Sequence, residues 1–446
     1  MITLNNINLS SIDLSGIDLR GIKLGLGGRG GGSGDGFPQL PGDVTRWHFG
    51  GLTNEMMAAM DDPRIEDADH KGRFLSFKNF AWKEGSGISD IYAGALVFDG
   101  VDDYGVCDNF PILTKEKGFT IVAVRQFISV KTSSLLSKWV AADESGAFIF
   151  EGTTVAGTKI NSAFGGYFRG LEKTILSYMT STSYNGNTIV PGNKTDTNNN
   201  LVVGRYYSDL NLHYANAAIW ELVFLDHDAT EEELTKIKDY FVKTYPWLFP
   251  NQAWTVVGKT NEDEDRATIA NITGNGNDLV LSNFGFIEGS GYNEEGEYAG
   301  YLVTDGVDDK AVSKQFKIGE NFTVILDFKF PVKKISYCGF DLSAKVRIQN
   351  FQGSGVYVVL KGNKTLIPSN VVRAVTSEGK VYDENWNEYN IVPGNISSNY
   401  TMVNLGFDGS NQFAESATKL AGIYSSTLSK DDCIKAYNYL QTLKAK

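Results

Sequence analysis

Cysteine, histidine and proline are all scarce in this chain. Its 446 residues include 3 cysteines, 4 histidines and 10 prolines. The cysteines do not recur at related positions, and the histidines have no metal-ligand spacing. The sequence therefore predicts neither a disulfide framework nor a zinc site. These residues are Cys107, Cys338 and Cys433, and His48, His70, His213 and His227.

Long apolar runs and clusters of basic residues are also missing. No stretch of about 18 apolar residues is present, which predicts that the chain does not insert into a membrane. The opening sequence MITLNNINLS lacks the basic and apolar regions of a signal peptide, so we expect none. A net charge of −12 without a basic stripe argues against nucleic acid as a partner.

What the chain does contain is a duplication. The motifs EGSG, YAG and DGVDD occur in that order within residues 84–103 and again within residues 288–309. A further motif, IVPGN, follows in each half. Repeated anchors in one order indicate two related units, each far longer than the ~20–50 residues of a solenoid repeat. We expect one domain over residues 43–249 and a second over residues 250–446.

Residues 1–25 form a different kind of segment, in which isoleucine and leucine each recur every five residues. The unit resembles the pentapeptide repeat, with isoleucine where that family has a small residue. So short a segment cannot bury its own apolar stripe, so we predict that it anchors the protein or joins it into a homotrimer. A disordered tail is the alternative. Residues 26–42 are Gly-rich and are predicted to be a linker. The predicted assembly residues are Ile2, Leu4, Ile7, Leu9, Ile12, Leu14, Ile17, Leu19, Ile22 and Leu24.

Gly-rich turns separate segments rich in aromatic and β-branched residues, which predicts an all-β protein. The Asn-Gly pair at residues 185–186 is typical of a type I′ hairpin turn. Each unit ends in an apolar strand, at residues 217–224 and 420–424, followed by a predicted helix. Thr230, with a glutamate three positions later, predicts a capping box, and Ser429 is the second N-cap.

The motifs of residues 43–249 resemble the laminin-G/concanavalin A-like family. They include LVFDGVDDYGV, SYNGN, LVVGR and AAIWELVFLDHDATEEEL. Residues 250–446 depart further from the family pattern, because Lys310 replaces Tyr104 and Leu405-Gly406-Phe407 replaces the Gly-Arg pair. The resemblance implies two tandem antiparallel β-sandwiches of jelly-roll type, each closing with a short helix.

The segment at residues 259–284, placed before such a module, is similar to virion proteins of tailed, crAss-like phages of gut Bacteroides. In those proteins the modules decorate head or tail fibres. The resemblance implies that the chain is located in a virion. It also implies a capsid or tail protein as a partner through residues 1–25.

Laminin-G modules sometimes hold Ca²⁺ at a rim, and carboxylate oxygens are the ligands that this ion prefers. The candidate metal ligands are therefore the aspartates of the two DGVDD motifs, Asp99, Asp102, Asp305 and Asp308. The alternative is that they accept hydrogen bonds from turn amides, as Asx residues do. No other cofactor is expected.

A loop in the second unit, at residues 382–389, replaces the shorter SYNGN hairpin of the first unit and is longer by four residues. Its aromatic and amide side chains suit stacking on a sugar ring combined with hydrogen bonding. Packing of its tryptophan on its own sandwich, or on a neighbouring subunit, is the alternative. The candidate ligand-binding residues are Tyr382, Asn385, Trp386 and Tyr389, together with Tyr206 and Tyr207 of the first unit.

Laminarinase-like relatives of this fold carry paired carboxylates on one strand, spaced ExDxxE. The acidic cluster at residues 262–265 has another spacing, the one at 231–233 begins a helix, and no P-loop or nucleophile elbow is present. The sequence therefore predicts a protein without enzymatic activity, a virion appendage that attaches to host-surface or mucosal glycans through several weak sites. A bacterial carbohydrate-binding lectin and a capsule depolymerase are the alternatives.

Overall fold

The computed structural model describes residues 36–445 apart from several short segments. The predicted assembly residues, Ile2 to Leu24, and the first part of the predicted linker lie outside the described residues. The other segments outside the description are 130–131, 141–144, 154–158, 171–174, 198–199, 208–212, 331–337, 344, 351–355, 396–399 and 408–412.

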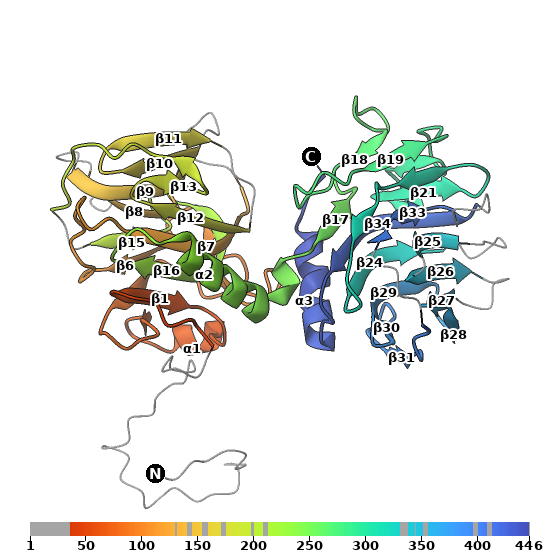
Figure 1. Ribbon diagram of the computed structural model, residues 1–446, viewed down its shortest axis with the longest axis horizontal. Coiled ribbons are helices and arrows are strands. Elements are labelled where there is room, and N and C mark those ends of the chain that lie inside the picture. Colours follow the sequence, from red (N-terminus) through yellow and green to blue (C-terminus); the bar gives the residue numbers. More distant parts are fainter. Residues whose placement is uncertain are drawn as a thin grey trace, which may run out of the picture.

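The described residues form two lobes, and each lobe is a sandwich of two eight-stranded antiparallel sheets (Figure 1). In the first lobe the helix-side sheet has the order β14 (Asn187–Thr188), β13 (Ser183–Tyr184), β12 (Leu176–Thr180), β7 (Thr120–Phe127), β16 (Asn216–Leu225), β5 (Ala95–Asp99) and β4 (Gly87–Ser89), with β1 (Val44–His48) also paired to β16. The outer sheet has the order β11 (Gly166–Gly170), β10 (Lys159–Ala163), β9 (Ser145–Thr153), β8 (Leu136–Val140), β15 (Leu201–Val203), β6 (Tyr104–Cys107), β3 (Phe74–Lys78) and β2 (Arg64–Glu66).

The second lobe repeats this topology. Its helix-side sheet has the order β20 (Gly291–Asn293), β21 (Tyr301–Asp305), β34 (Glu415–Tyr424), β24 (Thr323–Lys329), β29 (Val371–Thr376), β30 (Lys380–Tyr382) and β31 (Glu388–Asn390), with β17 (Gln252–Thr255) on β34. The outer sheet has the order β18 (Thr268–Ile269), β19 (Leu279–Ser282), β22 (Lys310–Val312), β33 (Val403–Leu405), β25 (Cys338–Leu342), β26 (Val346–Asn350), β27 (Val356–Leu360) and β28 (Asn363–Ile367). A small separate sheet pairs β23 (Phe316–Lys317) with β32 (Tyr400–Thr401). The all-β sandwich architecture predicted from the sequence is confirmed, whereas the ends of the two predicted domains stay a prediction.

The predicted helices are α2 (Glu231–Thr244) and α3 (Lys430–Gln441). The hydroxyl of Thr230 accepts a hydrogen bond from the Glu233 amide at 3.3 Å, and the Glu233 carboxylate accepts one from the Thr230 amide at 2.8 Å. This capping box satisfies two backbone donors that a helix start leaves unpaired. Ser429 caps α3 by accepting from the Asp432 amide. The remaining helical turns are α1 (Asn54–Ala58), η3 (Pro246–Leu248) and η4 (Gly296–Tyr298).

Both faces of β16 are buried, as its apolar run predicts. Ile219 and Phe224 belong to the core between the two sheets, while Trp220 packs with α2 in a second cluster on the opposite face. A register shift between Ile219 and Glu221 explains why the inward side chains do not alternate strictly along the strand. A two-layer sandwich leaves the outer face of this sheet open to solvent, but here α2 covers it. The strand β16 therefore needs apolar side chains on both faces.

A buried carboxylate ties each helix to its sheet. In the first lobe Glu221 accepts a hydrogen bond from the hydroxyl of Tyr245, which follows α2, at 2.6 Å. In the second lobe Asp327 accepts from Tyr437 and Gln441 of α3, at 3.2 and 2.8 Å. Because buried polar groups cost free energy unless they are paired, these contacts specify one seating of each helix on its sheet.

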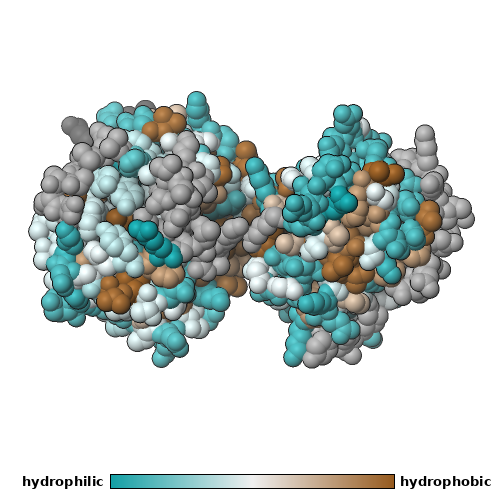
Figure 2. All heavy atoms as spheres, turned by 90° about the horizontal axis from the view of Figure 1, so that it is seen from above, coloured by the Kyte–Doolittle hydropathy of each residue, from teal (hydrophilic) through white to brown (hydrophobic). Residues whose placement is uncertain are grey.

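The two lobes meet around η3 and α3, and α3 lies on the side of the second lobe that faces the first (Figure 1). The Tyr424 hydroxyl donates to the Trp247 carbonyl at 2.9 Å, and the Lys435 ammonium lies 4.2 Å from the Trp247 ring. Gln126 of the first lobe donates to Thr442 of the second at 3.0 Å. From above, the lobes join at a narrow waist and their surface is largely hydrophilic (Figure 2). Within the described part of the chain, no helix has the length and apolarity that crossing a membrane requires.

Candidate functional site

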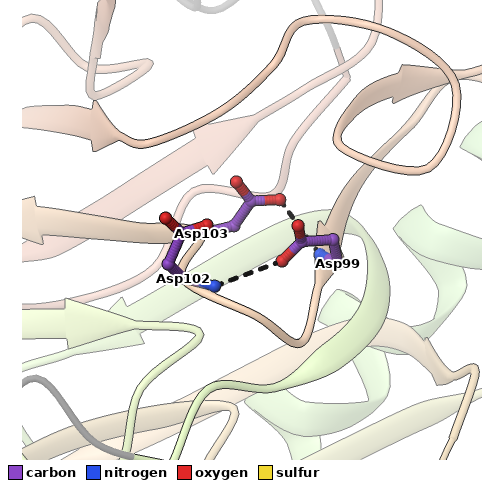
Figure 3. A group of neighbouring side chains, drawn as sticks. All are labelled: Asp99, Asp102 and Asp103. Atoms are coloured by element: carbon purple, nitrogen blue, oxygen red, sulfur yellow. Dashed lines mark hydrogen bonds between the residues drawn. The ribbon is translucent and has the colours of Figure 1, made fainter.

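The two DGVDD motifs form the same turn in both lobes. The Asp99 carboxylate accepts hydrogen bonds from the amides of Val101 and Asp102, at 2.7 and 3.4 Å, and Asp103 accepts from the Asp99 amide at 3.0 Å (Figure 3). Gly100 has φ +76°, and a Cβ there would meet the Cβ of Asn216 at 2.8 Å. The motif thus needs aspartate to accept turn amides and glycine to adopt the turn.

The turn of the second lobe matches it contact for contact. Asp305 accepts from the amides of Val307 and Asp308, at 2.8 and 3.4 Å, and Asp309 accepts from the Asp305 amide at 2.9 Å. Gly306 has φ +74°. The turn role that the sequence left as an alternative is therefore present for Asp99 and Asp305. The second carboxylate that accepts a turn amide is Asp103 or Asp309 rather than Asp102 or Asp308.

Each turn also gathers three carboxylates. One oxygen from each of Asp99, Asp102 and Asp103 lies within 4.8 Å of the others, and the second lobe repeats this with Asp305, Asp308 and Asp309. Asp103 and Asp309, which directly precede β6 and β22, complete these groups and were not among the predicted ligands. Ca²⁺ takes about 6–8 oxygen ligands, and the turn amides already occupy part of each group. Calcium binding stays a prediction.

The last aspartate of each motif is buried. Burial raises the pKa of Asp103 from its ordinary 3.8 to about 7, and the charges of Asp99 and Asp102 add to the rise. Burial likewise raises the pKa of Asp309 to about 6. A raised carboxyl pKa means that the folded protein holds a proton which the unfolded chain has already released.

We expect these carboxyls to weaken the fold as the pH rises from about 4 to 7, because each must lose its proton in a buried place. The double variant D103N/D309N keeps an acceptor for the turn amides and cannot ionise. The thermal midpoint of the wild type, measured relative to that variant by calorimetry, should therefore decrease as the pH is raised from 4.5 to 7.5. A constant difference across this range would contradict the assignment.

Aromatic side chains gather at the same end of the first lobe. Arg205 and Tyr214 form an isolated bridge there, and the Arg205 guanidinium lies 4.1 Å from the centre of the Tyr104 ring. Tyr206 and Tyr207 follow directly, with their rings 4.7 Å apart in an edge-to-face arrangement. We call the side chains of this end the aromatic rim: Tyr104, Arg205, Tyr206, Tyr207, His213 and Tyr214.

The tyrosine pair of the aromatic rim is only half-buried, and His213 beside it is exposed. The His213 ring lies 6.1 Å from Tyr206 and 6.2 Å from Tyr207. Burial raises the pKa of Tyr206 to about 12, so its hydroxyl keeps its proton and remains a donor at neutral pH. The rim thus offers apolar ring faces together with hydroxyl and imidazole groups.

In the second lobe, the cationic and the aromatic residue of the corresponding cation–π pair have exchanged positions. Lys310 stands where the first lobe has Tyr104, and its ammonium lies 5.6 Å from the ring of Phe407, which stands where the first lobe has Arg205. Phe413 stacks on Phe407 at 6.0 Å. The two departures from the family pattern therefore compensate each other and keep a cation–π pair, worth about 0.5–1 kcal/mol at an exposed site.

The predicted loop of the second lobe is built around a buried aspartate. Asp383 accepts from the amides of Asn385 and Asn387, each at 2.9 Å, and from the Tyr389 hydroxyl at 3.0 Å. Trp386 packs edge-on against Tyr437 of α3, with ring centres 5.8 Å apart. The structure thus brings these candidate residues together, and the tryptophan makes the contact with its own lobe that was the alternative prediction.

The candidate residues differ in what they expose. Tyr382 is buried, Trp386 and Tyr389 are half-buried, and Asn385 is exposed. Their contact with a sugar stays a prediction. The loop belongs to the second lobe and the aromatic rim to the first, so the chain presents two separate candidate surfaces.

No protein-family model and no curated protein matches this chain. Solved structures with some similarity include a Trypanosoma rangeli sialidase, at 8% identity and a TM-score of 0.30, over 84% of this chain and 60% of the sialidase. They also include the binding domain of Paraclostridial Mosquitocidal Protein 1, at 13% identity and a TM-score of 0.27, over 42% of this chain and 52% of that one. A third is the W1252A mutant of HCR D/C VPI 5995, at 8% identity and a TM-score of 0.30, over 81% and 96%.

This is an all-β sandwich protein. The chain spans about 60% of the length of the first sialidase it matches. The prediction of a chain without enzymatic activity is contradicted by the sialidases among these structures, and we withdraw it. A TM-score of 0.30 nevertheless assigns no reaction to this protein. The virion setting stays a prediction from the sequence.

Proposed function

We propose that this protein binds glycans and that the aromatic rim of the first lobe is a binding surface. The observation that carries the proposal is the half-buried pair Tyr206 and Tyr207, set edge to face beside the exposed ring of His213. Sugars bury an apolar ring face against aromatic side chains while their hydroxyls need hydrogen-bond partners, and this rim supplies both kinds of group.

Two further features support the rim over the loop of the second lobe. The loop uses its tryptophan to pack against α3, which leaves less ring surface for a ligand. Arg205 also donates to the Tyr207 carbonyl at 2.9 Å, which fixes the backbone that presents the tyrosine pair. A surface that is already ordered loses less entropy when a ligand binds.

The setting that we propose is a virion of a tailed phage, in which residues 1–25 join three copies and attach them to a capsid or tail protein. The support is the sequence resemblance together with the apolar stripe of that segment. Single sugar contacts are weak, and several copies that engage one surface multiply the affinity. A bacterial lectin would use the same rim without the virion partner.

A glycan array tests the proposal. The full chain should bind one class of host-surface or mucosal glycan, and Y206A/Y207A should bind that glycan at least about tenfold more weakly, since a loss of 1.4 kcal/mol is tenfold. Tyr357, which is half-buried on β27 of the second lobe, provides the matched control Y357A, expected to bind normally.

Two outcomes would end the proposal. One is a full chain that binds no glycan on an array that includes host capsule and mucin sugars. The other is equal binding by Y206A/Y207A and the wild type. Removal of residues 1–25 is expected to weaken binding to the array through lost multivalency, while leaving binding to a soluble monovalent form of the same glycan unchanged.

A further inference from the structure

Lys138 and Asp196 form an ion pair that is completely buried in the first lobe. The Lys138 ammonium lies 3.2 Å from Oδ2 of Asp196, and both side chains are 0% exposed. Lys138 is on β8 of the outer sheet, and Asp196 lies in the segment that leads from β14 to β15. The folded chain thus keeps an amine and a carboxyl group in contact at a place that water does not reach.

The second lobe has an apolar residue at the position of this lysine. Leu136 and Phe340 pair with corresponding residues of β15 and β33, and Lys138 and Leu342 each lie two positions further along their strands. Leu342 is fully buried. Because the same sandwich forms with leucine at this position, the fold alone does not explain why the first lobe buries two charges here, which costs free energy.

The backbone is held on both sides of Asp196. The Thr195 carbonyl accepts a hydrogen bond from the Gly146 amide at 2.8 Å. The hydroxyls of Thr197 and Ser145 lie 3.0 Å apart. Groups that a scaffold holds in contact in this way react as if at a concentration of about 10⁵–10⁸ M. The carboxyl group of Asp196 is therefore positioned to react with the neighbouring amine.

The surroundings of the pair favour the loss of both charges. Burial lowers the pKa of Lys138 below its ordinary value, although the charge of Asp196 acts in the opposite direction. Burial raises the pKa of the nearby Cys107 thiol to about 11, so this thiol adds no second negative charge at neutral pH. The Phe110 ring lies 5.5 Å from the ammonium. A reaction that turns the pair into a neutral group would remove the cost of burying two ions.

We propose that Lys138 and Asp196 join in an isopeptide bond, an amide between Nζ of the lysine and Cγ of the aspartate. A proton first passes from the ammonium to Oδ1, which frees the lone pair on Nζ. The bond from Nζ to Cγ then forms, and the bond from Cγ to Oδ1 breaks. Of the three ammonium hydrogens, one stays on Nζ and two leave with Oδ1 as water, so the step needs no oxidant or co-reactant.

The amide of Leu113 supports this step. It donates a hydrogen bond to Oδ2 of Asp196 at 2.8 Å. Negative charge gathers on Oδ2 while Nζ attacks Cγ, and a donor already placed at that oxygen stabilises the charge. Leu113 lies between β6 and β7, so the site is assembled from three separate segments of the first lobe.

The crosslink would close a covalent ring that contains β9 to β14 and so joins strands of both sheets. A crosslink stabilises a fold mainly by restricting the unfolded chain. The three cysteines are free thiols, so an isopeptide bond would give the first lobe a covalent lock that reducing agents do not open. This site is separate from the aromatic rim and does not depend on glycan binding.

Mass spectrometry of the denatured full chain tests the proposal. The wild type should weigh one water molecule less than its sequence predicts. K138R keeps a positive charge, but its guanidinium does not lose a proton in proteins and so cannot attack Cγ. This variant should have the full mass calculated from its own sequence. Circular dichroism checks that it folds.

Digestion with trypsin locates the bond. An amide on Nζ blocks cleavage after Lys138, so the peptide of residues 132–159 should remain uncut and be joined to the peptide of residues 195–205. Lys345 is the internal control. It is also buried, but its ammonium donates to the backbone carbonyl of Gly319 at 3.2 Å, which has no oxygen that can leave. Trypsin should cleave after Lys345 as usual.

A wild type with the full mass of its sequence would overturn the proposal, whether or not K138R folds. A loss of water that maps to an Asp-Gly pair, such as residues 99–100, would overturn it too, because there the aspartate has cyclised onto the next amide. The same holds for a loss of water that persists in K138R. None of these outcomes bears on the aromatic rim, which the glycan array tests independently.

Discussion

Replacing Glu151 by alanine should lower the free energy of unfolding of the first lobe by about 3–5 kcal/mol. Glu151 on β9 pairs with Arg125 on β7 inside the sandwich, where their side chains are 0% and 3% exposed. The Tyr184 hydroxyl also donates to this carboxylate, at 2.7 Å. Without Glu151 the guanidinium remains buried and loses its partner, which is what makes the loss so large.

Urea denaturation followed by tryptophan fluorescence measures this effect. The control is K236A, which removes an exposed ion pair between Lys236 and Glu232 and should cost less than about 0.5 kcal/mol. The triple change R125M/E151M/Y184F replaces these three polar side chains by apolar ones and should recover most of the lost stability. A loss below about 1 kcal/mol for E151A would mean that water reaches the pair.

The second lobe has apolar side chains at the position of this buried ion pair. Arg125 lies opposite Ile219 of β16, and Phe328 lies opposite Thr418 of β34. These two strands correspond in the two lobes, so Phe328 holds the place of Arg125. Phe328 packs edge-on against Phe330, with ring centres 4.9 Å apart. One fold therefore tolerates either a buried ion pair or an aromatic pair at one position, in keeping with the near balance between desolvation and pairing.

The second prediction with a large expected effect is a loss of stability when the tryptophan near the start of either lobe is truncated. Trp47 on β1 and Trp254 on β17 hold matching places, opposite Leu222 of β16 and Ala421 of β34. Both are buried, and each belongs to the inner core of its own lobe rather than to the cluster that the lobes share. We expect W47A to cost the first lobe about 3–5 kcal/mol and W254A to cost the second lobe a similar amount.

Differential scanning calorimetry and urea denaturation of the full chain measure these costs. Each variant should shift the transition of its own lobe and leave the other within about 0.5 kcal/mol, because distant sites add independently. Y167A, an exposed aromatic truncation, should shift neither transition by more than about 0.5 kcal/mol. Equal shifts of both transitions by W47A would show that the lobes unfold as one unit.

Several local features were predictable because they depend on neighbouring residues alone. The Asn-Gly pair at residues 185–186 adopts positive φ at both positions, 45° and 81°, as a type I′ turn requires. The capping box at Thr230 and the cap at Ser429 depend on side chains three positions apart. The turn role of the DGVDD aspartates likewise depends on amides within four residues.

Other features needed contacts between distant segments. The sequence marks Lys310 and Phe407 as two separate departures from the family pattern. Only the approach of the Lys310 ammonium to the Phe407 ring, at 5.6 Å, shows that they compensate each other. The composition of the loop at residues 382–389 predicts a sugar-binding surface, whereas its Trp386 packs on a helix some fifty positions later, at Tyr437.

The sequence by itself determined that this protein has two related all-β units, where their turns and helix starts lie, and that a third, apolar segment precedes them. Those features follow from backbone preferences and periodicity, which act over a few residues. Only the tertiary structure decided which rings remain open to a ligand and that Arg125 pairs with Glu151. The physical reason is that pairing, burial and cavities depend on which distant surfaces meet, and no local pattern fixes that.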